Sequence, residues 1–255
     1  MQLRPGTVVD RYVVEGVLGE GAVAVVYRAR HRKLGSTHAL KLLKTPGDAI
    51  NERLLREGQL QSTLRHPNVL SVTDLVHVHS TPALVMEFVP GPTLAEFLRH
   101  HTLSLEQCDA LARDLLSGVA AAHAHGLVHR DLKPSNILID VTANALVPKV
   151  GDFGLAKVID PEGAIHLATQ TGAPLGTPSY MAPEQIQDAS SVDTRADIFS
   201  LGTILYEMVT GTKCFSADNI MEIWQKICGG TYAPIAEHAA EVPRRMSLAI
   251  DGALR

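Results

Sequence analysis

The sequence predicts an α+β protein with two lobes, a small β-rich lobe followed by a larger and mostly helical one. Residues 12–88 are dominated by short apolar and β-branched runs, with a single helical stretch among them. A cluster of chain breakers follows at Val89-Pro90-Gly91-Pro92. Beyond it, apolar residues recur every three or four positions, which is the spacing of a buried helix face. We therefore place the first lobe at 1–88, a hinge at 87–92 and the second lobe at 93–255.

In the first lobe, period-two and β-branched patterns predict five strands, at 12–18, 23–29, 38–43, 72–78 and 83–88. One helix is expected at about 51–64, because leucines recur along it with helical spacing. In the second lobe, Thr93 with Glu96 and Ser104 with Gln107 form capping-box patterns that open two helices. Further helices are expected at 194–209, ending at Gly211, and at 220–227. A short strand pair is expected at 137–140 and 148–150.

Composition excludes several classes of protein. With 255 residues, 45% apolar content and a net charge of −4, the chain is typical of a globular protein and has no basic tract for nucleic acid. Its three cysteines have no CxxC spacing, which favours a reducing compartment. No signal peptide and no apolar run long enough for a bilayer is visible. We expect a cytoplasmic location, with a membrane-anchored parent protein left open. The twelve histidines include close pairs, but we interpret them as surface or helix residues because no metal-binding spacing accompanies them.

The segment from His129 to Asn136, followed by Asp152, brings together the groups needed to move a phosphoryl group from a metal-bound nucleotide. Asp131 can orient and deprotonate a hydroxyl, and Lys133 can neutralise charge on the phosphate. Asn136 and Asp152 offer oxygen ligands of the kind that a hard cation such as Mg²⁺ takes.

Read as H-R-D-L-x-x-x-N with Asp152-Phe153-Gly154 after it, this pattern resembles the protein kinases. The closest resemblance is to bacterial serine/threonine kinases related to the eukaryotic ones, and it runs from about Tyr12 to the end. It implies a bilobal kinase fold and transfer of the γ-phosphate of ATP, with Mg²⁺ or Mn²⁺, to protein Ser/Thr hydroxyls. Lys133 favours Ser/Thr over Tyr acceptors. Ser135 gives no indication of a preference for basic substrates.

The resemblance also assigns the nucleotide site. Lys41 would contact the α- and β-phosphates and pair with Glu57, with Glu52 as the alternative. Gly19-Glu20-Gly21 would cover the phosphates; the string also fits a dinucleotide fingerprint, but β-rich residues follow it where that fingerprint needs a helix. Adenine would be held by backbone groups of Glu87 and Val89 and by apolar side chains. The remaining ATP-binding residues implied are Leu18, Val26, Ala39, Met86 and Leu138.

Two positions depart from the family pattern. Ala24 stands where kinases carry a third glycine, at a cost of about 1 kcal/mol if a positive φ is required there. We expect an altered phosphate-covering loop that still binds. Gln61 stands where an apolar residue is usual, and we expect it to loosen the active position of the helix.

Regulation and support are likewise implied by the resemblance. By resemblance, the polar stretch 154–176 is the activation loop, and Thr169 and Thr171 are its candidates for autophosphorylation. Arg130 would bind the phosphate added to this loop. Thr177 would contact Asp131 and Lys133 when peptide binds. Asp197 would hold the backbone of His129 and Arg130.

The end of the chain gives a further expectation. Residues 243–255 resemble the penultimate helix of the family, so the final helix is expected to be missing. The arginine that pairs with Glu184 would then lie beyond Arg255, leaving Glu184 unpaired in a fragment or a truncated domain.

The sequence leaves two rival functions to compare with protein phosphorylation. A small-molecule phosphotransferase is disfavoured by Ala182-Pro183-Glu184 and the long loop before it, which serve protein substrates in the family. A catalytically inactive binding module is disfavoured because every residue of the phosphate chemistry is present. Self-association for autophosphorylation between chains is left open.

Overall fold

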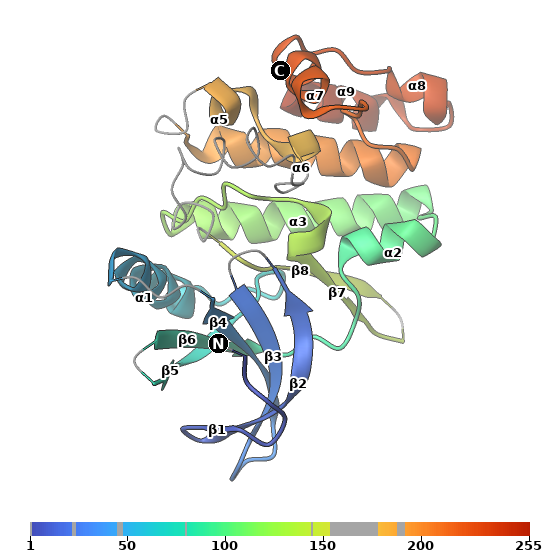
Figure 1. Ribbon diagram of the computed structural model, residues 1–255. Coiled ribbons are helices and arrows are strands. Elements are labelled where there is room, and N and C mark those ends of the chain that lie inside the picture. Colours follow the sequence, from blue (N-terminus) through green and yellow to red (C-terminus); the bar gives the residue numbers. More distant parts are fainter. Residues whose placement is uncertain are drawn as a thin grey trace. The chain divides into compact units, whose positions relative to one another are not determined.

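The computed structural model describes residues 2–21, 24–44, 48–79, 81–143, 145–153, 178–187 and 192–255. The chain divides into two compact units, Met1–Pro90 and Gly91–Arg255, and each is described by itself. The first is β-rich and the second mostly helical (Figure 1). The predicted α+β class is therefore correct.

The first unit is built on one antiparallel sheet of six strands in the order β1-β2-β3-β4-β6-β5. Helix α1 packs against β5 and β6. The five predicted strands and the predicted helix are all present, and β1 is additional. The elements are β1 (Val8–Val9), β2 (Tyr12–Glu20), β3 (Ala24–His31), β4 (Thr37–Leu43), α1 (Asp48–Thr63), β5 (Val72–Val78) and β6 (Thr81–Glu87).

The core of this unit lies on one face of the sheet. Tyr27, Leu40 and Val85 come from three neighbouring strands and are completely buried. Alternate residues of a strand point to opposite faces, so every second residue of the apolar runs contributes a side chain to this buried face. Tyr27 also accepts a hydrogen bond from the backbone N–H of Leu3, 3.0 Å from its hydroxyl oxygen, which holds the N-terminal segment against the core.

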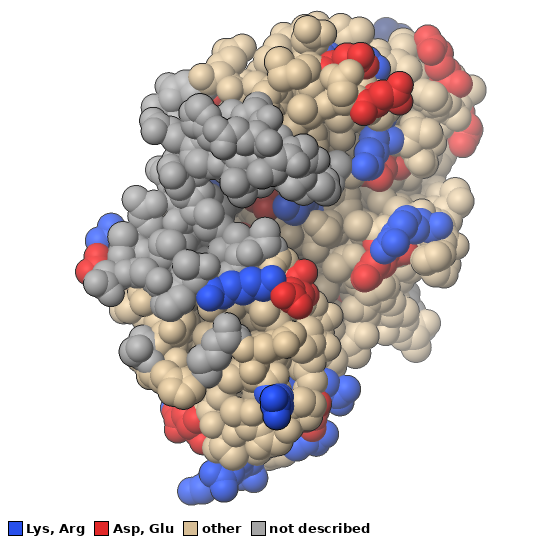
Figure 2. All heavy atoms as spheres, viewed as in Figure 1, with Lys and Arg blue, Asp and Glu red and all other residues tan. Residues whose placement is uncertain are grey.

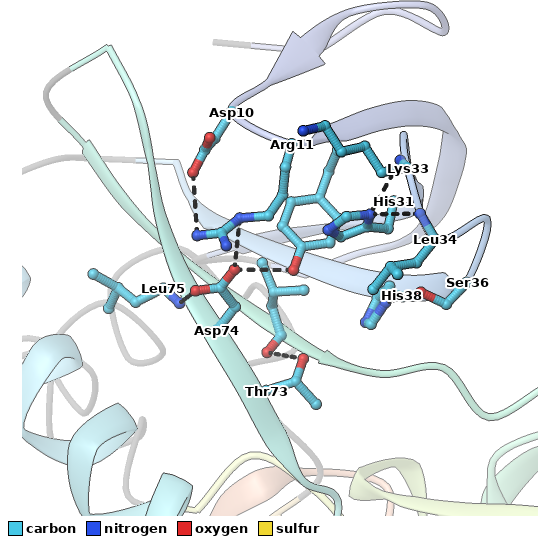
Figure 3. A network of polar contacts seen from close by, with 12 residues as sticks. Asp10, Arg11, His31, Lys33, Leu34, Ser36, His38, Thr73, Asp74 and Leu75 are labelled. Atoms are coloured by element: carbon cyan, nitrogen blue, oxygen red, sulfur yellow. Dashed lines mark hydrogen bonds and ion pairs between the residues drawn. The ribbon is translucent and has the colours of Figure 1, made fainter.

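A polar cluster joins four strands of the sheet at one end (Figure 3). Asp74 in β5 accepts a hydrogen bond from the Tyr12 hydroxyl at 2.9 Å and lies 3.3 Å from Nε of Arg11. The rings of His31 and His38 stand edge-on to Tyr12, with centroids 5.2 and 5.3 Å away. Burial, and then the charge of His31, lower the pKa of His38 below its ordinary value. The neutral form of His38 is thus favoured in the fold.

The second unit consists of helices and one short hairpin. The predicted capping boxes are both formed, at Thr93 before α2 and at Ser104 before α3. Helix α6 ends at Gly211, whose φ of 71° is the left-handed conformation that glycine adopts without strain. Its elements are α2 (Leu94–His100), α3 (Leu105–Ala124), η1 (Pro134–Asn136), β7 (Ile137–Val141), β8 (Leu146–Val150), η3 (Pro178–Tyr180), α5 (Pro183–Gln187), α6 (Thr194–Thr210), α7 (Ile220–Cys228), α8 (Ile235–His238) and α9 (Arg244–Ala253).

Helix α6 forms the centre of this unit. It lies alongside α3 and also packs against α5, α8 and α9 (Figure 1). Its buried residues include Ala196 and Tyr206, which join a core with Phe215 from the following loop. At Gly202 the approach of α9 is close, because an added Cβ would meet the Ala253 side chain at 3.0 Å. Strand β8 of the hairpin β7–β8 packs against α3.

Two short helices, α5 and α8, were not indicated by the sequence, because each has fewer than six residues and shows no periodicity. In the described part of the chain, no helix combines the length and the apolar character needed to cross a membrane. On the face drawn in Figure 2, the described Lys and Arg residues are scattered among Asp and Glu over both units.

Candidate active site

The segment between α3 and β7, which contains His129, Arg130 and Asp131, is anchored by the carboxylate of Asp197 from α6. Asp197 is completely buried. Its Oδ2 accepts the backbone N–H of His129 at 2.8 Å, and its Oδ1 accepts the backbone N–H of Arg130 at 2.8 Å. These are the contacts expected from the sequence. A third bond, 2.7 Å from Nε2 of His123 to Oδ2, was not anticipated.

The charge of Asp197 is favoured despite its burial. Burial raises the pKa of this carboxyl, but hydrogen bonds from His123, His129 and Arg130 outweigh burial and bring the pKa below its ordinary value. The carboxylate therefore stays ionised across the neutral pH range. A buried anion with all of these donors in place fixes the segment that it binds.

Arg130 has a left-handed backbone, with φ of 65°. For a residue with a Cβ this conformation costs about 1–2 kcal/mol. Its Nη2 donates to the carbonyl of Val192 at 3.3 Å, while its buried Nε has no hydrogen-bond partner within the part of the chain that the structure describes. Strain and an unpaired donor at one residue are typical of functional sites.

Asp131 contacts Lys133 and Asn136, the two residues that the sequence grouped with it. Nζ of Lys133 lies 2.7 Å from Oδ2 of Asp131, and Nδ2 of Asn136 lies 3.2 Å from the same oxygen. Nδ2 of Asn136 also donates to the backbone carbonyl of Asp131 at 2.8 Å. All the side-chain contacts of Asp131 within the described residues thus fall on one oxygen. The other oxygen remains available to accept the proton of an incoming hydroxyl.

The hairpin brings the segment of Asp152 back to Asn136. Ile137 of β7 pairs with Val150 of β8, and the backbone N–H of Gly151 donates to the carbonyl of Asn136 at 2.9 Å. His129 links the two strands to the preceding loop, since its Nε2 lies 2.7 Å from the carbonyl of Gly151. Because a carbonyl can only accept, Nε2 carries the proton and Nδ1 accepts the backbone N–H of Asp131 at 3.3 Å.

The oxygen ligands proposed from the sequence fit a hard divalent cation. The amide nitrogen of Asn136 is engaged by Asp131, which leaves its carbonyl oxygen as the group that can coordinate. Asp152 supplies a carboxylate from a backbone with φ of 63°. No cluster of three or more metal-binding His, Cys, Asp or Glu side chains occurs among the described residues. One carboxylate and one amide suit Mg²⁺ or Mn²⁺, which take their other ligands from phosphate and water.

The segment 178–187 packs against this loop. The hydroxyl of Tyr180 donates to Glu207 of α6 at 2.6 Å, and the hydroxyl of Ser200 donates to the carbonyl of Tyr180 at 2.7 Å. Burial, and then the charge of Glu207, raise the pKa of Tyr180. Gln185 reaches the loop itself, because its Nε2 donates to the carbonyl of Arg130 at 2.6 Å. Gln185 carries no signal in the sequence, because its bond goes to a backbone carbonyl. His123 belongs to a close histidine pair that the sequence led us to interpret as surface or helix residues.

Glu184 of this segment is partly buried and has no ion pair with another described residue. Its charge helps to raise the pKa of Arg195, after the larger effects of Asp193.

Of the residues assigned to phosphate binding in the first unit, Gly19 lies on β2, Gly21 directly follows β2, and Lys41 lies on β4. Lys41 is buried in β4, opposite Val26 of β3 and Leu84 of β6. Gly19 pairs with Val26. Among the residues assigned to adenine in this unit, Leu18 is exposed on β2, whereas Ala39, Met86 and Val89 are buried. Glu87 ends β6, and its Oε1 accepts the backbone N–H of Ser71 at 2.8 Å. Leu138, in β7, belongs to the second unit and pairs with Lys149.

Position 24 does not require a glycine. Ala24 begins β3 and is not among the residues with positive φ, so the conformational cost considered for alanine does not arise. The backbone N–H of Gly21 donates to the carbonyl of Ala24 at 2.9 Å, and an ion pair of 2.6 Å joins Glu20 to Lys44 at the end of β4.

Gln61 has a defined place in the first unit. It is buried near the end of α1, where its Nε2 donates to the carbonyl of Leu70 at 2.9 Å. This bond ties the end of the helix to the segment before β5. The expectation that Gln61 loosens the helix is not tested by the structure, but the bond acts in the opposite direction.

Several sequence assignments lie outside the described residues. The side chain of Glu57 is not described, although its backbone is part of α1. Thr169, Thr171 and Thr177 fall within 154–177, which the structure does not describe. These assignments stay predictions.

Comparison with known proteins identifies relatives of this chain. A model of the protein kinase domain matches residues 12–250. Serine/threonine-protein kinase PkaA of Streptomyces coelicolor is 35% identical over 95% of the chain and 44% of its own length. Serine/threonine-protein kinase PknB of Mycobacterium tuberculosis is 34% identical over 92% of the chain and 38% of its own length. The chain thus spans less than half the length of these curated relatives.

A solved structure gives the same result for the fold. The structure described as Rad53 1-466 in complex with AMP-PNP is similar to this chain with a TM-score of 0.78 and 27% sequence identity. The match covers 96% of this chain and 60% of the other.

Proposed function

Because the chain belongs to the protein kinase family, we propose that it transfers the γ-phosphate of ATP to serine and threonine hydroxyls of protein substrates. The observation that carries the proposal is the arrangement at Asp131, where an ammonium and an amide converge on one carboxylate oxygen at 2.7 and 3.2 Å. That arrangement orients a carboxylate and places a positive charge beside it.

In this proposal Asp131 accepts the hydrogen of the substrate hydroxyl, so that the hydroxyl oxygen points at the phosphorus atom. Lys133 stabilises negative charge on the phosphoryl oxygens during transfer. Asn136 holds the backbone of Asp131 through the 2.8 Å bond to its carbonyl, so each residue of the group restricts the others. Such positioning supplies most of the catalytic effect in phosphoryl transfer, because the protein forms no covalent bond.

Mg²⁺ or Mn²⁺ would be held by Asn136 and Asp152, and when bound it neutralises charge on the phosphates. Gly19, Gly21 and Lys41 would hold the phosphates, with Glu57 as the partner of Lys41. Adenine would be contacted by Leu18, Val26, Ala39, Met86, Glu87, Val89 and Leu138. Support for these roles comes from the family membership and, for Leu18, Gly19, Val26, Ala39, Lys41, Met86, Glu87 and Leu138, from their positions on strands.

Regulation by phosphorylation of Thr169 or Thr171 is part of the same proposal. The buried Nε of Arg130 supports it, because this N–H has no hydrogen-bond partner among the described residues and could donate to a phosphate oxygen, although Nη2 already donates to the Val192 carbonyl. Thr177 would contact the acceptor segment. We also propose a cytoplasmic location for this domain, protein substrates not selected for basic residues, and phosphorylation between two copies of the chain.

The test compares wild type with Asp131→Asn, using radiolabelled Mg-ATP and casein as a substrate rich in Ser and Thr. Asp140→Asn in β7 serves as the matched control, because its carboxylate is part of no contact in the site. Wild type and the control should transfer phosphate, while Asp131→Asn should lose at least a hundredfold in rate. Equal incorporation by wild type and Asp131→Asn would refute the assignment. Nucleotide binding without transfer by wild type would favour an inactive module.

A further inference from the structure

Gln185, in α5, uses both ends of its side-chain amide. Its Nε2 donates to the carbonyl of Arg130 at 2.6 Å, and its Oε1 accepts the backbone N–H of Ala182 at 2.9 Å. A planar amide with both ends engaged has its orientation fixed, because exchanging O and N would break both bonds. Gln185 therefore connects its own helix start to a stretch of backbone at Arg130, 55 residues before it in sequence.

The carbonyl that Gln185 binds belongs to the peptide group leading into Asp131. The other side of Arg130 is held by Asp197, which accepts the Arg130 N–H at 2.8 Å. Arg130 itself is left-handed, with φ of 65°, a conformation that persists only where surrounding contacts hold it. Asp197 from α6 and Gln185 from α5 thus act on opposite ends of one strained residue. Without the second contact, the peptide before Asp131 could rotate toward a relaxed conformation.

Gln185 also lies close to the catalytic side chains. It lines the same small cavity as Asp131, Lys133, Tyr180 and Met181. The cavity is thus bordered both by the residues assigned to chemistry and by the segment 178–187. A change in the position of that segment would reach Asp131 directly through Gln185.

We propose that Gln185 is a positioning residue for phosphoryl transfer, which holds the Arg130 carbonyl and thereby sets the orientation of the Asp131 carboxylate. The inference rests on the proposed function. Gln185 is not among the residues assigned to the nucleotide or the acceptor, so its loss should lower kcat while leaving the KM for ATP within about twofold. If Gln185 acted only in packing, its loss would lower the folded fraction without lowering the kcat of the folded protein.

Gln185→Glu isolates the contact. Glutamate keeps the oxygen that accepts the Ala182 N–H but places a second oxygen against the Arg130 carbonyl, where a donor is needed. We expect kcat at pH 7.5 to fall about tenfold, equivalent to about 1.4 kcal/mol. Gln187→Glu is the matched control, because Gln187 is an exposed glutamine at the end of the same helix. It should keep wild-type kcat.

A pH profile gives a readout that packing would not change. When the introduced glutamate is protonated it regains a donor, so kcat of Gln185→Glu relative to wild type should rise as pH falls from 7.5 to 5.5. The titratable and charged groups around this position are Arg130, Asp131, Lys133, Tyr180 and Glu207, and all occur in wild type too, so the ratio removes their own titration. Gln185→Met lacks donor and acceptor at every pH, and its kcat ratio should stay low and constant.

The experiment uses the whole chain with Mg-ATP and casein, and fluorescence of the single tryptophan, Trp224, reports the folded fraction. A wild-type kcat in Gln185→Glu or Gln185→Met, with folded protein, overturns the inference. So does a Gln185→Glu ratio that does not change with pH. If Gln185→Glu does not fold, Gln185→Met decides, because it carries no charge. Failure of wild type to transfer phosphate overturns the proposed function itself, a result visible without any Gln185 variant.

Discussion

Asp197 is the residue whose replacement tests most directly how the catalytic loop is held. Its carboxylate is completely buried and accepts three hydrogen bonds of 2.7–2.8 Å, from His123, His129 and Arg130. Two of the donors are backbone N–H groups, and neither has a second hydrogen-bond acceptor among the described residues. Replacing Asp197 therefore exposes the cost of unpaired buried donors.

The geometry sets the size of the effect. In Asp197→Asn, one carboxylate oxygen becomes an NH₂ group, so either the His129 or the Arg130 N–H loses its acceptor, at a cost of about 1–3 kcal/mol. In Asp197→Ala both are lost, and the same figure applied twice gives about 2–6 kcal/mol. The pKa of Asp197 lies below its ordinary value, so the stabilisation from its ionised form is fully present above the ordinary value and is lost as pH falls through the lower pKa of the folded state. Neutral pH therefore shows the full effect.

The assay is urea unfolding at pH 7.5, followed through Trp224, with kcat measured on the same samples. Asp193→Asn is the control, because Asp193 caps the same helix from an exposed position and asparagine caps equally well. It should unfold like wild type. If Asp197→Asn is as stable and as active as wild type, or if Asp197→Ala costs no more than Asp197→Asn, then the carboxylate does not hold the loop in the way described.

Two further predictions concern the first unit. Gln61→Leu introduces the apolar residue usual in the family. It should destabilise the unit by about 1–2 kcal/mol in urea unfolding, because the Leu70 carbonyl loses its donor. A more stable variant would show that the bond contributes nothing. Burial, and then His31, lower the pKa of His38 below 6.5, so the unfolded chain binds more protons near that pH and stability should fall as pH drops from 7.5 to 5.5. His38→Asn should flatten this dependence in thermal unfolding, and an unchanged slope would exclude His38 as its source.

Local signals in the sequence were sufficient for most of the fold. The capping boxes at Thr93 and Ser104 located two helix starts, and Gly211 located the end of α6, because each motif satisfies backbone groups within a few residues. Strand positions followed from alternation, which reflects burial of one face. The short helices α5 and α8 were missed, since their formation depends on packing rather than on a pattern of their own.

The candidate site was predictable only in part, for a related reason. Asp131, Lys133 and Asn136 lie within six residues, so their mutual contacts follow from a local motif. Gln185 and His123 act from distant positions on a backbone carbonyl and on a buried carboxylate. The bond of Gln185 goes to a backbone group, which leaves no residue-type signature at the accepting end. The bond of His123 joins residues 74 apart in sequence, which no local motif connects.

Arg130 shows why these distant supports matter. Its left-handed backbone costs about 1–2 kcal/mol by itself, so the loop would relax unless other contacts offset that cost. The offset comes from Asp197 on one side and Gln185 on the other, at separations of 67 and 55 residues along the chain. Neither bond can form until α5 and α6 are packed in place. The orientation of Asp131 is therefore a property of the assembled helical unit, and substitutions in α5 can alter catalysis without touching a reacting atom.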